Sequence, residues 1–388
     1  MAARVGSSRR ALGRARRRRC EAALVCEAPD RAPLYLPAVS CGVASAVLGR
    51  AAIAGTGSLH FAEVAAWADG ADAHAEFETR LTEDLVAVHR SLDADVLRLP
   101  WRMNRRPDAR LDEHTFRFGP EAGEYTVWQY QPATGDFSPV YASPPKVRPE
   151  ERLRRTVEQL EASLGDPRAT AQEVEPVIRL QRDFGDEFFV IGASAHIGVG
   201  LAPEDLELLV TEPDLVRRWC LLQADFAIAV GRALLAGGCP PVILGGGDLA
   251  GSLGPFYSPV MFRALVLPAY VKALAALNAQ GVHYIFRSDG NLWPLVGMLF
   301  GEAGCPGYGE TDRDALMTVA AVRAQFPRLV IWGNVSSALL ARGTPAQVRA
   351  QAQAALAEAG GRGYFQGCSN ALIQGTPLEN VRALCAVR

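Results

Sequence analysis

The sequence predicts a single α/β domain folded as a (β/α)8 TIM barrel, and three observations lead to this prediction. Short apolar runs rich in β-forming residues recur along the chain, and polar residues or glycines follow them. Helical stretches separate most of the runs, which indicates parallel βαβ units. The runs number eight, which favours a closed barrel; they lie at residues 34–37, 96–99, 188–191, 242–244, 284–286, 307–309, 329–332 and 364–365.

Several helix starts are marked by capping residues. The segment 344–347 (Thr-Pro-Ala-Gln) combines an N-cap, a proline at the first helical position and a capping-box glutamine, and the segment 376–379 (Thr-Pro-Leu-Glu) repeats this pattern. Thr311 is expected to cap the helix after the sixth strand. The longest helix is expected at about 212–236, and another at about 258–280.

One segment interrupts the strand and helix alternation. Residues 113–143 contain alternating β-forming residues between glycine turns, which predicts a β-hairpin inserted after strand two. A long loop is expected over 41–60. We therefore predict an Arg-rich disordered tail at 1–15 and one barrel domain at 16–388.

Composition and charge exclude several classes of protein. The formal net charge of -2 argues against a nucleic-acid-binding protein. Apolar runs fall short of the ~20 residues that span a bilayer, and glutamates interrupt the run after the N-terminal arginines, as a signal peptide would not allow. The eight cysteines are scattered without a CxxC pair, which favours free thiols and a cytoplasmic location. The oligomeric state is not predicted.

Polar residues follow the expected strands, where a barrel assembles its active site. Asp248 and Asp289 stand beside glycines that let a substrate approach the backbone. Each of the other residues also has a structural interpretation, such as a rim histidine, a solvated arginine, a turn asparagine or an inert buried thiol. These other candidates are Asp95, Arg102, His196, Arg287, Asn291, Glu310, Asn334, Cys368 and Asn370.

The motifs together resemble the uroporphyrinogen decarboxylase (URO-D) superfamily, which joins true decarboxylases to cobalamin-dependent methyltransferases. The resemblance covers Asp248 with the segment 254–268, the Arg-Ser-Asp-Gly-Asn segment 287–291, the segment 333–345 and the segment 367–380. The segment 18–34 resembles the family's opening helix and first strand. Family members have a (β/α)8 barrel, which agrees with the fold expected from the strand pattern.

The chain departs from both branches of this family. The decarboxylase loop with its Met-Arg-Gln-Ala-Gly-Arg context has no match, and the segment 92–97 matches the catalytic aspartate segment only loosely. Methyltransferases hold zinc with His-x-Cys at strand five and a cysteine at strand eight. Cys368 falls on the last position, but Arg287 and Asp289 replace the strand-five pair, and an arginine cannot ligate a metal. We therefore expect no tightly bound cofactor and no zinc, with Cys368 as the candidate metal ligand.

The resemblance favours methyl transfer from a small methylated substrate, such as a methyl ether or methylamine, to a corrinoid (cobalamin) on a partner protein that docks over the barrel mouth. Asp248, Asp289 and Glu310 would bind or protonate the leaving group, with His196 as a candidate proton donor. Arg287 would hold an anionic substrate group. The other residues predicted to contact substrate are Asp95, Arg102, Asn291, Asn334 and Asn370. Two alternatives are a uroporphyrinogen decarboxylase of porphyrin biosynthesis, with Arg102, Arg105, Arg106 and Arg110 forming a cationic cleft, and a non-catalytic binding barrel.

Overall fold

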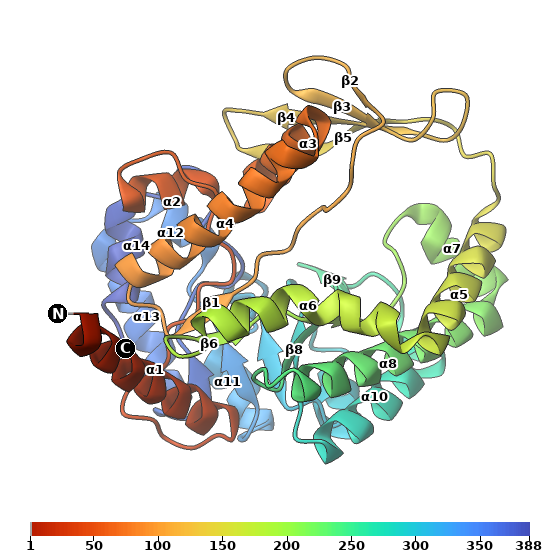
Figure 1. Ribbon diagram of the computed structural model, residues 1–388. Helices are drawn as coiled ribbons and strands as arrows, with labels where there is room; N and C mark the ends of the chain where they lie inside the picture. The colour runs from red at the N-terminus through yellow and green to blue at the C-terminus, as the bar shows by residue number, and fades with distance from the viewer. Residues whose placement is uncertain (1) are drawn as a thin grey trace.

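The protein was analysed as a computed structural model that describes residues 2–388. Parallel strands follow one another in chain order, with helices around them (Figure 1). A six-stranded sheet has the order β14-β13-β12-β11-β8-β7, and β1 pairs with β6. The strands are β1 (Val96–Arg98), β6 (Phe189–Ile191), β7 (Ser194–His196), β8 (Val242–Gly246), β11 (His283–Arg287), β12 (Gly307–Gly309), β13 (Val330–Trp332) and β14 (Tyr364–Phe365).

The regular ladders do not form one continuous closed barrel. A short irregular segment around Leu34 lies between β14 and β1: it forms a single parallel bridge with Gln366, and its carbonyl accepts hydrogen bonds from the backbone of Asp95 and Val96. Prolines at 33 and 37 flank this segment and have no N–H donor, which limits the ladder here. Seven of the eight predicted strands are therefore present, parallel and in the predicted order, whereas the first forms only an isolated bridge and the ladders do not close into a barrel.

Side chains alternate between two faces of these strands. One set packs together inside, where Trp332 stacks on Phe365 with ring centroids 3.7 Å apart and meets Tyr35 edge-on. The alternate set, including Leu97 and Ile331, packs outward against the helices. Helix α1 adds buried side chains of its C-terminal half to the inner cluster.

Helices form the outer layer. Their bounds are α1 (Ala2–Leu24), α2 (Cys41–Leu48), α3 (Thr56–Asp69), α4 (Ala71–Ser91), α5 (Pro149–Gly165), α6 (Pro167–Phe184), α7 (Pro203–Thr211), α8 (Pro213–Ala236), α9 (Pro259–Met261), α10 (Leu267–Ala279), α11 (Val319–Gln325), α12 (Ser337–Arg342), α13 (Pro345–Ala359) and α14 (Leu378–Cys385). Shorter π- and 3₁₀-helical turns lie at Phe262–Val266, Gly297–Glu302 and Arg313–Ala315.

The local predictions for the helices had mixed outcomes. The capping box of Thr344 and Gln347 is present at the start of α13. The cap predicted at residue 376 is wrong, because α14 begins one residue later than expected and no side chain caps it. The cap predicted at Thr311 is also wrong: Asp312 accepts the backbone N–H groups there. The loop predicted over 41–60 contains helix α2 and the start of α3.

The segment after β1 is larger than the hairpin that the sequence predicts. It forms a four-stranded antiparallel sheet, β2-β3-β4-β5, which stands off the rest of the molecule together with α3 (Figure 1). Val64 of α3 packs against Phe116, Phe118 and Phe137 of the sheet. The strands are β2 (Ala109–Arg110), β3 (Thr115–Phe118), β4 (Thr126–Gln131) and β5 (Asp136–Ala142). A separate small hairpin, β9 (Ala250–Gly251) and β10 (Gly254–Pro255), follows β8.

Two segments are long and apolar enough to cross a bilayer by length and composition alone, which the sequence reasoning did not anticipate. They are Pro213–Ala236 and Pro259–Ala279. Both contribute buried residues to the large cluster between the strands and the helices, as core helices of a water-soluble domain do. Their apolar composition is therefore explained by packing within the domain.

Candidate active site at the carboxyl ends of the strands

The strand ends bring several predicted site residues to one edge of the sheet. His196 ends β7, Asp248 follows β8, Arg287 ends β11 and Glu310 follows β12, and these strands are parallel neighbours. The Nδ2 atom of Asn370, which lies beyond β14, donates a hydrogen bond to Oδ2 of the Asp289 carboxylate over 2.7 Å. This edge, hereafter the mouth, is the candidate active site.

Gly246 allows β8 and β11 to approach closely at the mouth. Its φ is +87°, and an added Cβ would lie 2.3 Å from the carbonyl oxygen of Arg287. A side chain there would displace the strand end, so a glycine is required. The Gly246 carbonyl oxygen lies 2.7 Å from Nδ1 of His196, and His196 and Asp248 line a cavity of about 370 Å³.

Arg287 and Glu310 form an ion pair at the floor of the mouth, with side chains 17% and 10% exposed. Burial, together with the positive charge of Arg98, lowers the pKa of Arg287 to about 10. The guanidinium remains protonated at neutral pH. Because Glu310 is committed to this pair, its geometry suits positioning Arg287 more than the leaving-group chemistry predicted for it.

Arg98 is a further mouth residue that the sequence reasoning did not select. It ends β1, is 8% exposed, and its Nη1 donates to the hydroxyl of Tyr35 over 3.3 Å and to the carbonyl of Pro37. The signal was present in the sequence. Val96 packs in the inner cluster and Leu97 in the outer one, so the two-residue period of a strand places Arg98 inward.

The two aspartates of the mouth differ in their surroundings. Burial raises the pKa of the Asp289 carboxyl, and the nearby charges of Asp248 and Asp312 raise it further, although the hydrogen bond from Asn370 opposes this. Asp248 itself is exposed. The raised pKa of Asp289 suits a proton donor.

His196 does not suit the role of proton donor that the sequence predicted. Partial burial of its ring lowers its pKa, and the charges of Arg287 and Arg98 add to this, although the contact with the Gly246 carbonyl opposes it. The imidazole is then neutral at pH 7. That contact assigns the single ring proton to Nδ1, which leaves Nε2 as an acceptor.

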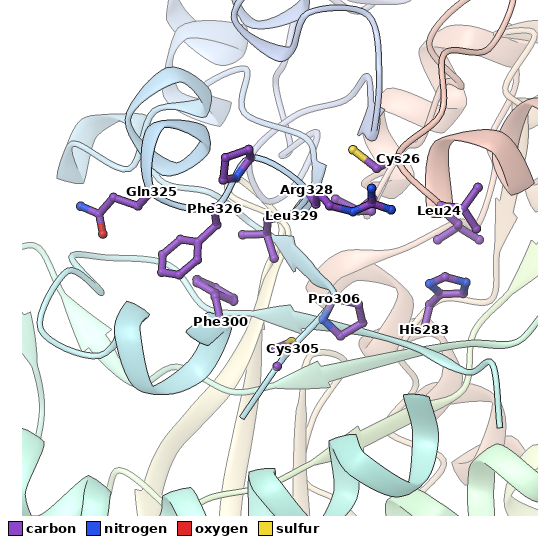
Figure 2. Close-up of a pocket in the computed structure, with 14 residues that line it drawn as sticks. Leu24, Cys26, His283, Phe300, Cys305, Pro306, Gln325, Phe326, Arg328 and Leu329 are labelled. Atoms are coloured by element: carbon purple, nitrogen blue, oxygen red, sulfur yellow. The ribbon is translucent and has the colours of Figure 1, made fainter. Parts of the chain in front are cut away.

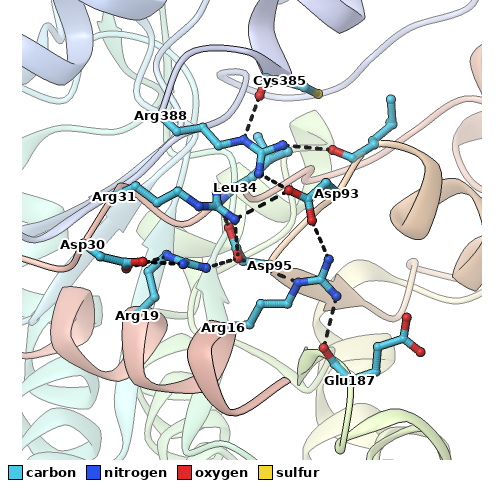
Figure 3. Close-up of polar contacts among 11 residues, drawn as sticks. Arg16, Arg19, Asp30, Arg31, Leu34, Asp93, Asp95, Glu187, Cys385 and Arg388 are labelled. Carbon is cyan, nitrogen blue, oxygen red and sulfur yellow. Dashed lines mark hydrogen bonds and ion pairs between the residues drawn. The ribbon is translucent and has the colours of Figure 1, made fainter. Parts of the chain in front are cut away.

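Asp95 is not at the mouth, contrary to the prediction. It precedes β1 and so lies at the opposite, amino end of the strands, where it is fully buried (Figure 3). Arg19 donates to its Oδ1 over 2.5 Å, Arg31 donates to both oxygens over 3.0 and 3.2 Å, and the backbone N–H of Leu34 donates over 2.8 Å. Asp95 therefore fastens α1 and the first strand segment to β1.

Arg102 also has a structural explanation in place of substrate contact. Its guanidinium pairs with the fully buried Glu63 of α3 and with Glu78 of α4, the latter over 3.1 Å. The side chain thereby ties the loop after β1 to both helices.

Two predicted asparagines organise loops near the mouth. The buried Asn334, with a φ of 117°, donates to the Thr311 hydroxyl over 2.9 Å and holds the loop after β12. The Oδ1 atom of Asn291 accepts from the backbone of Trp293 over 3.1 Å. Asn334 is fully buried, whereas Asn291 is half-buried and only its Oδ1 is engaged in this bond.

The residues present do not fit the zinc site of the methyltransferases. Cys368 is buried in an apolar cluster with Val335 and Cys385, and burial raises its thiol pKa to about 12, which disfavours the ligating thiolate. Arg287 brings a positive charge to a former ligand position. Within residues 2–388, no group of three His, Cys, Asp or Glu side chains is placed to hold a metal ion. Metal content itself stays a prediction.

A larger cavity lies away from the mouth. It measures about 740 Å³, and Phe300, Phe326 and Leu329 line one side of it while His283 and Cys26 line the other (Figure 2). His283 begins β11 and Leu329 precedes β13, so this cavity is at the amino ends of the strands. It is separate from the polar groups described above.

Comparison with known proteins agrees with this arrangement. Residues 202–388 match the family model "Uroporphyrinogen decarboxylase (URO-D)". Over these residues, just under half of its length, the chain is similar to the uroporphyrinogen decarboxylase family. A solved structure, a methyltransferase from Methanosarcina mazei, superimposes with a TM-score of 0.62 at 18% identity, covering 95% of this chain and 96% of that one. At this identity the likeness shows that the two share a fold. No curated protein matches the chain.

Proposed function

We propose that this chain is a URO-D superfamily methyltransferase that removes a methyl group from a small substrate and passes it to a corrinoid held by a separate protein. The observation that carries the proposal is the layout of charge at the mouth. The buried Arg98 and the half-buried Arg287 lie at the floor, and the carboxylates of Asp248 and Asp289 lie closer to solvent. The superfamily match and the fold shared with a methyltransferase support it.

The same layout argues against a porphyrinogen substrate. An octacarboxylate would need many unpaired cationic groups. Of the four arginines that could form such a cleft, Arg102 pairs with two glutamates, Arg110 pairs with Asp69, and Arg105 lies over the ring of Phe118. The positive charge left at the mouth suits a small anion.

The proposed roles follow from the surroundings of each group. When the methyl group leaves a substrate oxygen or nitrogen, that atom gains an electron pair and must take up a proton. Asp289, with its raised pKa and its orienting bond from Asn370, would supply the proton. Asp248 stabilises the protonated form of Asp289 by its negative charge. The corrinoid would accept the methyl group, and no step involves zinc.

The test is methyl transfer by the purified protein to a panel of corrinoid proteins, from methyl ethers and methylamines with and without a carboxylate. We expect turnover with a carboxylated donor and at least a hundredfold loss in Asp289→Asn, the range for removal of a general acid. Asp225→Asn, which changes a surface ion pair with Lys272, is the matched control and should retain full turnover.

Two results would contradict this proposal. Carbon dioxide release from uroporphyrinogen would favour the decarboxylase. Ligand binding without turnover of any donor would favour a non-catalytic barrel.

A further inference from the structure

Arg98 is a buried guanidinium that the protein itself does not neutralise. The partners of its Nη1 are the Tyr35 hydroxyl and the Pro37 carbonyl, which are neutral oxygens. Its Nε is buried without a hydrogen-bond partner. Among the ion pairs of residues 2–388, none includes Arg98. The residue is nevertheless buried, with only 8% of its surface exposed. A buried charge without a counter-ion is strongly unfavourable.

The neighbouring groups leave this positive charge in place. Arg287 is close enough for its pKa to be lowered by Arg98, and its own charge is met by Glu310. Glu310 pairs with Arg287 and not with Arg98, and the carboxylates of Asp248 and Asp289 also act on Arg287. Asp248 is exposed, so solvent screens its effect on this charge.

The surroundings also allow a small molecule to approach. Arg98 lines a cavity of about 220 Å³ together with Trp101 and Ser194. Arg287, Glu310 and Tyr35 border one small void on the inner side of the strands. Tyr35 borders this void and its hydroxyl accepts a hydrogen bond from Arg98, so it links the two arginines.

We propose that Arg98 is a specificity-determining residue that binds the carboxylate of a monoanionic substrate, with Arg287 beside it. A single guanidinium without a carboxylate partner favours a monoanion over a dianion such as phosphate. The planar fork of a guanidinium matches the two oxygens of a carboxylate. The assignment of the substrate class rests on the proposed methyl transfer. Binding of an anion at Arg98 can be measured without that reaction.

The experiment measures binding of acetate and benzoate at constant ionic strength, by calorimetry and by thermal shift. Acetamide and benzamide are the neutral matches, and phosphate and sulfate are the competing anions. We expect both carboxylates to raise the melting temperature of the wild type and both amides to have no effect. Arg98→Gln should weaken carboxylate binding by about tenfold or more, and Arg98→Lys, which keeps the charge but loses the fork, by less. Arg106→Gln, an exposed arginine in the loop after β1, should bind as the wild type does.

A second variant separates ligand binding from a structural role. Arg98→Met removes the buried charge, so without added anion its melting temperature should equal or exceed that of the wild type. A lower melting temperature for Arg98→Met, together with no carboxylate response in the wild type, would show that Arg98 only supports Tyr35 and the strand. Tighter binding of phosphate or sulfate would overturn the carboxylate assignment. Failure of methyl transfer with carboxylate binding intact would remove the proposed reaction and leave the anion site standing.

Discussion

Replacing Asp95 by alanine tests whether this aspartate supports the fold or contacts substrate. Its fully buried carboxylate accepts from Arg19 and Arg31 and from the backbone of Leu34. Removing one partner of a buried ion pair costs about 3–5 kcal/mol, because the remaining charge is left buried without a counter-ion. Arg19 keeps its pair with Asp30, and Arg31 is 23% exposed, so we expect the lower end, about 3 kcal/mol.

Thermal unfolding followed by circular dichroism measures this change. The unfolding entropy of a chain of 388 residues is on the order of 0.8 kcal/mol per kelvin, so the melting temperature should fall by about 4 °C. The control is Asp186→Ala, which removes a highly exposed carboxylate paired with Arg10 of the same helix α1 and should shift the melting temperature by less than about 1 °C.

The reasoning would be refuted by a specific pattern of results. If Asp95→Ala kept the wild-type melting temperature but lost affinity for substrate, Asp95 would be a substrate ligand after all. If the folded fraction of the variant keeps the wild-type KM, the assignment of Asp95 to the network in Figure 3 stands.

Two further predictions concern the mouth. Because the pKa of Asp289 is raised in the folded state, its ionised carboxylate disfavours folding at neutral pH, and its protonation adds stability as the pH falls through that raised pKa. Asp289→Asn should therefore change the unfolding free energy at pH 7 by less than about 1 kcal/mol and flatten the acid side of the plot of stability against pH. A large loss of stability at pH 7 would make Asp289 a structural residue. The protein should carry less than one zinc ion by elemental analysis, and a chelator and Cys368→Ala should each leave turnover unchanged, because that thiol is buried in the apolar cluster with Cys385 and burial raises its pKa. Stoichiometric zinc lost together with activity would contradict this.

The sequence determined the elements and their order, because strand and helix formation depends on short-range patterns. All eight apolar runs lie in or beside a parallel strand segment, and the capping box of Thr344 formed as its four residues predict. The two-residue alternation of side chains along β1 also predicts that Arg98 points inward, although the apolar run 96–99 was used only to locate a strand. His196, Asp248, Arg287 and Glu310, predicted as strand-end residues, lie at one edge of the sheet.

Only the tertiary structure decided which of these polar residues face one another. Asp95 and Arg98 lie three residues apart in the sequence, yet they occupy opposite ends of a strand, and long-range partners on α1 claim the aspartate. Arg102 meets a buried glutamate 39 positions away, and Cys368 turns toward the last helix. A charged side chain finds its partner through contacts distant along the chain, and the sequence pattern around each residue does not contain those contacts.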